Sequence, residues 1–414
     1  MIRAIASVTA LLVGVAILLT GQGLQGTLLP VRAAIEHFPP VSFGIFGAAY
    51  FLGFTLGCWR GSGLVQRVGH VRVFAAMTAL ASASPLLHGM WIDLYAWSVL
   101  RFVSGFCFAI LYVVIESWLN ETATNANRGA IFSAYVLINM TMMAAGQQLM
   151  LLDDPVVMTL FALSSVLVSL AAVPVVLSTA PSPGQVQDPA RLDIAHLYRT
   201  SPAGLLGTLT TGLANGSFWS LAPVVTISYS PDVSLTAWFM TTAVLGGAAS
   251  QWPLGAWSDR VDRRYVMAVC AFLACAVSVA IVAFAERLGF GGLILLGGLW
   301  GAAAFPLYSL SIAHSNDHAA ENEYVAISSG LLLMYGLGAV VGPLLASVAM
   351  QLAGPTGLFG YTGAIHVLLF GYLLMRRLRR SQAEAEEQVA FTEALTAAHT
   401  SSQVYEQEVL EKTD

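Results

Sequence analysis

Residues 92–118 read IDLYAWSVLRFVSGFCFAILYVVIESW, and this stretch decides the class of fold. Its only charged side chains are those of Asp93, Arg101 and Glu116, and most of the other residues are apolar. A helix needs about 20 mostly apolar residues to cross a bilayer. The residues do not alternate between apolar and polar as the strands of a membrane β-barrel do. The stretch therefore predicts a membrane-spanning helix with one arginine inside it.

Similar apolar stretches on both sides of this one bring the number of predicted membrane-spanning helices to twelve. The predicted spans are residues 5–29, 41–60, 71–90, 92–118, 129–151, 155–178, 203–229, 233–256, 265–285, 289–313, 325–351 and 357–375. The first is too long for the apolar region of a signal peptide, and no clear cleavage site follows it, so we expect the chain to keep it. The predicted fold class is an all-α polytopic membrane protein.

The composition excludes several classes of protein. Of the 414 residues, 57% are hydrophobic and 10% are charged, whereas about 25% of an average soluble domain is charged. This excludes an ordinary cytosolic enzyme, a nucleic-acid binder and a disordered chain. The sequence has no metal-ligand spacing and no phosphate-binding Gly-x-x-x-x-Gly-Lys loop. We therefore expect no catalytic residues, no metal and no cofactor, and we expect ATP not to be the direct energy source.

The arginines indicate the orientation of the chain in the membrane. With the N-terminus inside, the outside loops carry only Arg32 and Arg287, and an excess of Arg and Lys marks cytoplasmic loops. The inside segments carry Arg3, Arg60, Arg67, Arg72, Arg128, Arg191, Arg199, Arg260, Arg263, Arg264, Arg376, Arg377, Arg379 and Arg380. We therefore expect a multi-pass protein of the bacterial inner (plasma) membrane with both termini in the cytoplasm.

The longest polar interruption, residues 179–202, divides the chain into two halves. The expected organisation is an N-terminal six-helix bundle (1–178), a cytoplasmic linker (179–202), a C-terminal six-helix bundle (203–378) and an acidic cytoplasmic tail (379–414). From Ser381 onward, eight acidic residues face a single basic one. The tail is expected to be a solvated helix or disordered, with a regulatory or partner-binding role as the alternative.

The two halves also resemble each other in sequence. A shift of 196 residues aligns the fourth predicted helix with the tenth and the fifth with the eleventh. The matching pairs are Gly105 with Gly301, Tyr112 with Tyr308, Asn120 with Asn316, Glu121 with Asp317 and Gly146 with Gly342. Two parallel repeats related by an axis along the membrane normal place a solute site between them, near the middle of the membrane.

Several motifs resemble those of the major facilitator superfamily, over nearly the whole chain except the tail. The segment Gly255-Ala-Trp-Ser-Asp259-Arg260-Val-Asp262-Arg263-Arg264 is similar to the loop motif of that family. Its first-half counterpart, residues 62–70, has Gln66 where the motif has Asp. Arg101-Phe-Val-Ser-Gly105 resembles the family's fourth-helix motif.

Two more segments refine the resemblance. Gly338 and Gly342-Pro343 resemble a Gly-Pro motif that drug–proton antiporters carry in helix five, where this chain has Gly146-Gln147. The segment from Glu116 to Glu121 is similar to a branch of poorly characterised bacterial permeases. The resemblance implies twelve helices in two pseudo-symmetric bundles and secondary active transport by alternating access.

Arg101 is the first candidate for the substrate site. A charge at the centre of a membrane helix costs about 2.5–3.5 kcal/mol on insertion scales, so such a residue pairs with another group or lines an aqueous cavity. Arg101, Gln22 and Asn215 are the leading trio. The other candidates are polar or aromatic residues near helix midpoints: Gln25, Tyr50, Tyr112, Asn139, Gln147, Trp219, Tyr308 and Tyr335.

A second group of candidates is expected to form a cytoplasmic gate. The resemblance implies that the loop motif latches the cytoplasmic ends of the two bundles, and pseudo-symmetry places Asp259 near the start of helix five. Glu116 is about 22 Å from Arg101 along the helix axis, too far for a direct pair. The gate candidates are Asp259, Arg260, Arg263, Arg264, Arg67, Glu116 and Arg128.

Arg101, together with the absence of a carboxylate from the first predicted helix, favours an organic anion or a zwitterion as the substrate. Proton coupling is left open. The alternatives are a drug-type exporter of apolar compounds and a membrane sensor or scaffold that kept the fold without transport. The expected partners are a small-molecule substrate, the lipid bilayer and, in the coupled case, protons. The expected oligomeric state is a monomer.

Overall fold

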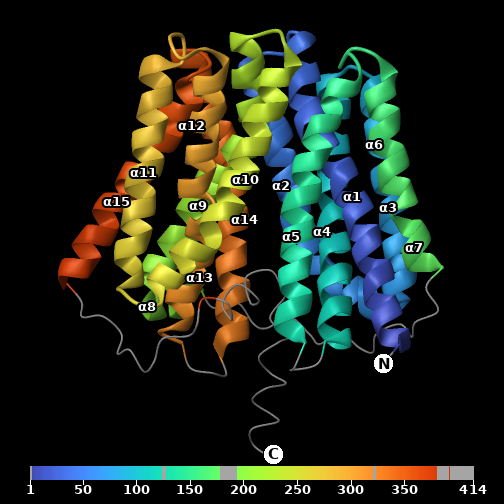
Figure 1. Ribbon diagram of the computed structural model, residues 1–414, viewed down its shortest axis with the longest axis horizontal. Helices are drawn as coiled ribbons and strands as arrows, with labels where there is room; N and C mark the ends of the chain where they lie inside the picture. The colour runs from blue at the N-terminus through green and yellow to red at the C-terminus, as the bar shows by residue number, and fades with distance from the viewer. Residues whose placement is uncertain (1, 124–126, 178–193, 320–322, 380–390, 392–414) are drawn as a thin grey trace, which may run out of the picture.

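The computed structural model describes residues 2–123, 127–177, 194–319, 323–379 and 391. These residues form long helices that run roughly parallel to one another (Figure 1). The helices are α1 (Ile2–Ile35), α2 (Pro40–Val68), α3 (His70–Met90), α4 (Leu94–Thr122), α5 (Arg128–Gln148), the 3-10 turn η1 (Leu149–Leu152), α6 (Met158–Leu170), α7 (Ala172–Val176), α8 (Ile194–Thr200), α9 (Pro202–Tyr229), α10 (Val233–Ser258), α11 (Arg263–Phe284), α12 (Gly289–Ala304), α13 (Pro306–Asn316), α14 (Tyr324–Ala353) and α15 (Gly357–Arg379).

The predicted all-α membrane fold is confirmed. In the described part of the chain, eleven spans are long and apolar enough to cross a membrane, with α5–η1, α6–α7 and α12–α13 each forming one span. The remaining predicted span, 203–229, is α9, which has 28 residues but a more polar sequence. Most of α9 is buried, including Thr208, Thr211 and Asn215, and the helix packs against α13, α14 and α15. Its polar groups therefore face protein and not lipid.

Two helices differ from their predicted spans for identifiable reasons. α1 continues to Ile35, so Arg32 lies inside a helix and not in an outside loop as expected. The tenth predicted helix is divided between α12 and α13 at Pro306, because proline has no N–H to donate to the preceding turn. Among the helix starts, Asp232 accepts hydrogen bonds at the N-terminus of α10, and these bonds lower the pKa of its carboxyl group.

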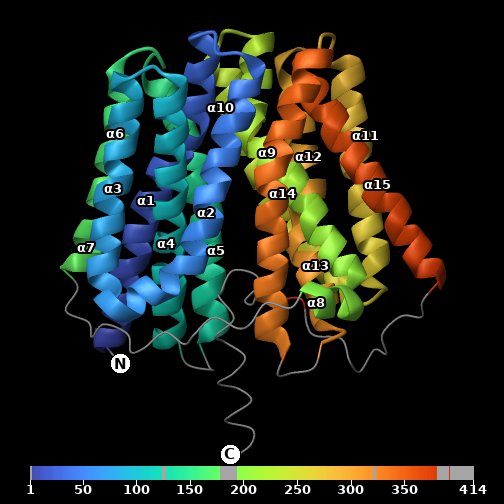
Figure 2. The same cartoon turned by 180° about the vertical axis from the view of Figure 1, so that it is seen from behind.

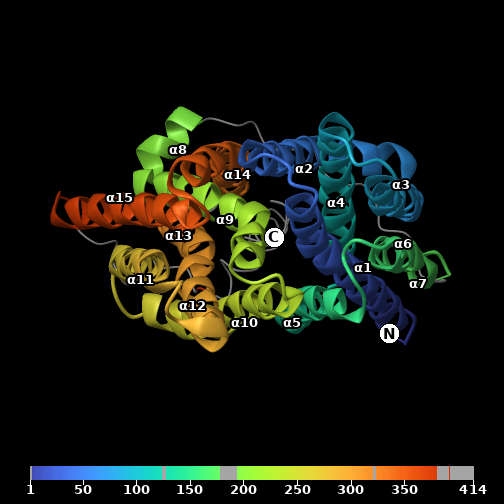
Figure 3. The ribbon, with the colours of Figure 1, turned by 90° about the horizontal axis from the view of Figure 1, so that it is seen from above.

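The helices form two bundles side by side. In the view from above, α1 to α7 occupy one side and α8 to α15 the other (Figure 3). Two seams join the bundles: α2 packs against α14, and α5 packs against α10. The view from behind shows the α2–α14 seam (Figure 2).

Equivalent glycines make equivalent helix contacts in the two bundles. A Cβ atom at Gly105 in α4 would overlap the carbonyl oxygen of Tyr50 in α2, and one at Gly301 in α12 would overlap that of Ala243 in α10. The two glycines are 196 residues apart, and the two carbonyls are 193 residues apart. Small residues allow membrane helices to approach this closely. The internal repeat is therefore present in the packing as well as in the sequence.

We call the end with the N-terminus and the 259–262 loop the inner end, following the predicted orientation, and the opposite end the outer end. At the outer end, one apolar cluster joins both bundles and includes Leu28, Phe46, Phe218 and Met240. The apolar clusters nearer the inner end each belong to one bundle. Among the described residues, an apolar cluster therefore joins the two bundles at the outer end, and the clusters nearer the inner end stay within one bundle.

Arg32 holds the outer end of the first bundle together. Its side chain is buried, pairs with Glu36 at 2.6 Å, and donates hydrogen bonds to the carbonyl oxygens of Pro155 (3.1 Å) and Val156. These bonds tie the end of α1 to the segment before α6.

We expect Arg32→Ala to destabilise the protein by about 2–3 kcal/mol, because hydrogen bonds to a charged group are worth about 1.5–3 kcal/mol each. Thermal unfolding of the purified protein measures the change. Arg287→Ala is the matched control, since that arginine is exposed in another outer loop. Equal midpoints for the two variants would show that Arg32 does not have this role.

Candidate functional site

Arg101 lies on α4 with its guanidinium over the ring of Tyr50, 4.3 Å from the ring centre. Its side chain is partly exposed. Among the described residues, no ion pair or hydrogen bond involves it. A desolvated cation–π contact is worth about 2 kcal/mol, but it leaves the five N–H donors of the guanidinium without acceptors. Arg101 therefore presents an uncompensated positive charge within the membrane.

Gln22 joins Tyr50 to a second tyrosine. Its Nε2 lies 3.1 Å from the hydroxyl of Tyr50, and its Oε1 accepts a hydrogen bond from the hydroxyl of Tyr112 at 2.9 Å. Phe54 fills the space between the two tyrosine rings, with ring centres 6.3 Å from Tyr50 and 6.1 Å from Tyr112. The structure thus brings Arg101, Tyr50, Gln22 and Tyr112 together from α4, α2 and α1.

The polar chain continues toward the inner end. The amide of Asn139 on α5 interacts with the hydroxyls of Tyr112 and Tyr135. The Tyr135 hydroxyl donates a hydrogen bond to Glu116 at 3.4 Å. A chain of amide and hydroxyl groups thus runs from Tyr50, whose ring lies against Arg101, to Glu116. Tyr135 was not among the residues predicted from the sequence. The only sequence feature that pointed to it was its position four residues before Asn139, on the same face of a helix.

The second bundle contributes a smaller polar group. The rings of Tyr308 on α13 and Tyr335 on α14 lie 4.8 Å apart, and Asn215 on α9 interacts with the Tyr335 hydroxyl. The Oδ1 atom of Asn215 is buried and has no hydrogen-bond partner among the described residues. Cys58 and Glu116 of the first bundle lie close enough to Tyr308 to act on it electrostatically.

Three candidates lie outside these two groups. Gln147 accepts a hydrogen bond from Thr241 across the α5–α10 seam, at 3.3 Å. Trp219 stacks on Phe305 at 5.4 Å within the outer apolar cluster. Gln25 is buried, and its Nε2 has no partner among the described residues. Gln147 and Trp219 thus contribute to the closed outer end.

The gate candidates on the second bundle form a buried ion-pair network. The Arg263 side chain is 1% exposed, and it pairs with Asp317 at 2.7 Å and with Asp259 at 3.0 Å. Arg264 pairs with Asp262 at 2.9 Å, and Asp262 also caps the first turn of α11. Asp317 was not among the gate candidates, although the repeat aligned it with Glu121.

The remaining gate candidates are less constrained. Arg260 and Arg67 are exposed. Arg128 begins α5, but its side chain lies outside the described residues. In this conformation the described contacts of Asp259 are with residues of its own half of the chain. They do not include the start of α5, where the sequence analysis had placed it.

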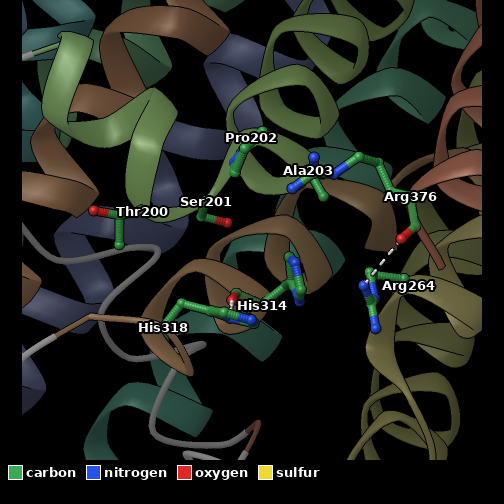
Figure 4. A pocket seen from close by; sticks show the side chains of 8 residues that line it. All are labelled: Thr200, Ser201, Pro202, Ala203, Arg264, His314, His318 and Arg376. Atoms are coloured by element: carbon green, nitrogen blue, oxygen red, sulfur yellow. Dashed lines mark hydrogen bonds between the residues drawn. The ribbon is translucent and has the colours of Figure 1, made fainter. Parts of the chain in front are cut away.

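A small pocket opens beside this network at the inner end (Figure 4). Basic side chains from three helices line it: Arg264 on α11, His314 on α13 and Arg376 on α15, together with His318 just after α13. Arg264 donates a hydrogen bond to the carbonyl oxygen of Arg376 at 3.4 Å. The pocket is separate from the Arg101 group and gathers arginine and histidine side chains at the inner end of the second bundle.

We expect Gly105→Ala to disturb the Arg101 group by pushing Tyr50 away. Overpacking a close contact costs about 1–3 kcal/mol, so both the thermal stability and ligand-induced stabilisation should fall. Gly371→Ala is the matched control, because that helical glycine has open space around its Cβ position and alanine is the better helix former. Similar unfolding midpoints for the two variants would contradict this account of the α2–α4 contact.

Two repeated helical bundles side by side are the architecture of many secondary transporters. The sequence model of the Major Facilitator Superfamily matches residues 204–407. An uncharacterized MFS-type transporter, YcaD, of Escherichia fergusonii is 28% identical over 370 residues, which cover 89% of this chain and 94% of the relative. A second one, from Enterobacter sp. strain 638, is 27% identical over 369 residues, with the same two coverages.

Solved structures share the fold at low sequence identity. The nucleoside transporter NupG aligns with a TM-score of 0.75 at 12% identity, over 90% of this chain and 99% of that one. A bacterial homologue of the human lysosomal transporter Spinster, in an inward-facing and occupied conformation, aligns with a TM-score of 0.72 at 12% identity, over 92% and 97%. The chain is thus similar to the major facilitator superfamily, as its motifs indicated, in its second half by the family model and over 89% of its length by the relatives. Together with the apolar spans of the described residues, this similarity supports a multi-pass membrane transporter.

Proposed function

We propose that this transporter moves a small organic anion or zwitterion by alternating access. The observation that carries the proposal is Arg101, a cation within the membrane that lies over the ring of Tyr50 and has no ion pair or hydrogen bond among the described residues. An acidic group of a solute would supply the missing acceptor. Aromatic rings on both bundles, from Tyr50, Tyr112, Tyr308 and Tyr335, fit an organic body better than a bare inorganic ion.

The proposed domains are the two bundles, 1–178 and 203–378, with the substrate between them. We take the described conformation, in which a shared apolar cluster joins the bundles at the outer end, as the state open at the inner end, and the proposed cycle exchanges it with the opposite state. We further propose that both termini are cytoplasmic, which is supported by the excess of arginines at the inner end, and that the protein works as a monomer.

Proton coupling is the second part of the proposal, and Glu116 is its proposed proton carrier. It ends the polar chain that starts at Tyr50, beside Arg101, and continues through Gln22, Tyr112, Asn139 and Tyr135. In proteoliposomes with a pH-sensitive dye inside, adding the substrate should change the internal pH for the wild type and not for Glu116→Gln. Substrate flux without a pH change in the wild type would show that transport is uniport and is not coupled to protons.

A thermal-shift screen of the purified protein tests the substrate class. The probes are benzoate, citrate and phosphate as anions, phenylalanine as a zwitterion, uridine as a neutral solute and tetraphenylphosphonium as an apolar cation. A ligand at 100 times its dissociation constant adds about 2.7 kcal/mol of stability. We expect stabilisation by an organic anion or by the zwitterion, and its loss in Arg101→Ala. Stabilisation by tetraphenylphosphonium alone, equal in both proteins, would replace this proposal with drug-type export.

A further inference from the structure

Phe391 lies in the acidic C-terminal segment, yet it is one of the most deeply buried residues of the protein. Its side chain is 1% exposed and belongs to the apolar cluster at the inner end of the second bundle. The sequence predicted a solvated or disordered tail, and an isolated aromatic residue among acidic ones was the only contrary signal. A buried phenyl ring is worth about as much as a core side chain, so the contact is a specific one.

The socket for Phe391 is built from the loop motif itself. Its ring lies against Gly255, where a Cβ atom would overlap the ring. Its backbone N–H donates a hydrogen bond to Oδ1 of Asp259 at 3.0 Å. The same oxygen atom accepts the ion pair from Arg263 at 3.0 Å. Phe391 therefore contacts the first glycine of the motif and its aspartate at the same time.

The charge of this face complements the sequence around Phe391. The basic pocket formed by Arg264, Arg376, His314 and His318 lies at the same inner end (Figure 4). Arg377 adds a further cation, stacked on Tyr265 at 4.9 Å. In the sequence, acidic residues lie on both sides of Phe391, at positions 384, 386, 387 and 393. Basic side chains beside an apolar socket fit an acidic segment that carries one aromatic anchor.

We propose that the inner face of the second bundle is a docking site for the chain's own acidic C-terminal segment, that Phe391 is its anchor, and that docking favours the conformation open at the inner end. The last part rests on the proposed alternating access and on the expected latch, in which Asp259 approaches the start of α5. Docking opposes that approach because the Phe391 N–H holds the Asp259 carboxylate within its own half.

Hydrogen exchange of the full-length protein in nanodiscs tests the docking. We expect the amide of Phe391 to be protected in the wild type, and to exchange at least about tenfold faster in Gly255→Ala, because the added methyl group displaces a buried ring. Gly63→Ala is the matched control. This glycine lies near the end of α2, in the first-half counterpart of the loop motif, and has open space around its Cβ position. An unprotected amide in the wild type, or equal exchange in the two variants, would overturn the docking.

Distances between spin labels test the effect on conformation. The labels are placed at Arg72→Cys and Leu378→Cys, two exposed positions at the inner ends of opposite bundles, in a background with the four native cysteines replaced by alanine. We expect Phe391→Ala to increase the population with short distances, and Val404→Ala, elsewhere in the tail, to leave the distribution as in the wild type. An unchanged distribution in Phe391→Ala would overturn the conformational part. Neither readout uses a solute, so a negative solute screen and a negative docking result are distinguishable.

Discussion

Arg101→Ala is expected to weaken the binding of an anionic solute by about 30-fold to 4,000-fold. Truncating one partner of a buried charge pair costs about 2–5 kcal/mol, and each 1.4 kcal/mol is a factor of ten in affinity. The effect should be large because Arg101 is the single cation in its group of described side chains, and Tyr50 offers it only a ring. Isothermal titration with the anion that stabilises the wild type in the screen measures the change.

Two further variants make the result specific. Arg101→Lys keeps the charge but loses the planar group that stacks on Tyr50 and binds a carboxylate through two N–H groups, so its affinity should lie between those of the wild type and Arg101→Ala. Arg287→Ala removes an exposed arginine at the outer end and should bind as the wild type does. If Arg101→Ala bound the anion as tightly as the wild type, the arginine would have a packing role and the substrate site would have to be sought elsewhere.

Arg263→Ala is expected to have the largest effect on stability, with a loss of about 3–5 kcal/mol. Removing one member of a buried ion pair costs this much because the remaining charge was desolvated with its partner. The guanidinium is 1% exposed, and the Asp317 side chain is 3% exposed, at 2.7 Å. The pair with Asp259 at 3.0 Å is lost as well. We expect a lower midpoint of thermal unfolding, measured in detergent or in nanodiscs.

Arg260→Ala separates this effect from a general change in loop charge. Arg260 is a neighbour in the same motif, but its side chain is exposed, and substitutions at such sites usually stay within about 0.5 kcal/mol. Equal unfolding midpoints for Arg263→Ala and Arg260→Ala would mean that the buried network contributes little. A loss confined to Arg263→Ala would establish that the motif is first a structural element of the second bundle.

The comparison with known proteins supports the fold and the transporter class, and it leaves the substrate to be tested. The solved structures that share the fold are only 12% identical where TM-scores reach 0.75 and 0.72. At such identity the residues of a substrate site can all differ while the helix packing persists. The assignment of a substrate class therefore depends on the side chains of this chain, above all on Arg101.

The sequence alone determined the membrane fold, the helix positions and the duplication. These properties follow from local composition: long apolar runs predict spanning helices, and glycines at a fixed shift predicted equivalent positions such as Gly105 and Gly301, which make equivalent backbone contacts. The structure differs from these predictions only in detail: Pro306 divides the tenth predicted helix in two, and α9 is more polar than the other spans.

The tertiary structure decided which polar residues act together, because helices distant in the chain supply them. Gln22, Tyr50 and Tyr112 come from three helices and meet through hydrogen bonds, whereas Gln147 and Trp219 face the seam and the outer cluster. The pattern of polar residues within one helix does not indicate which other helix packs against its polar side. For the same reason the sequence could not predict the contact between Gly255 and Phe391, because the two residues are 136 positions apart in the chain.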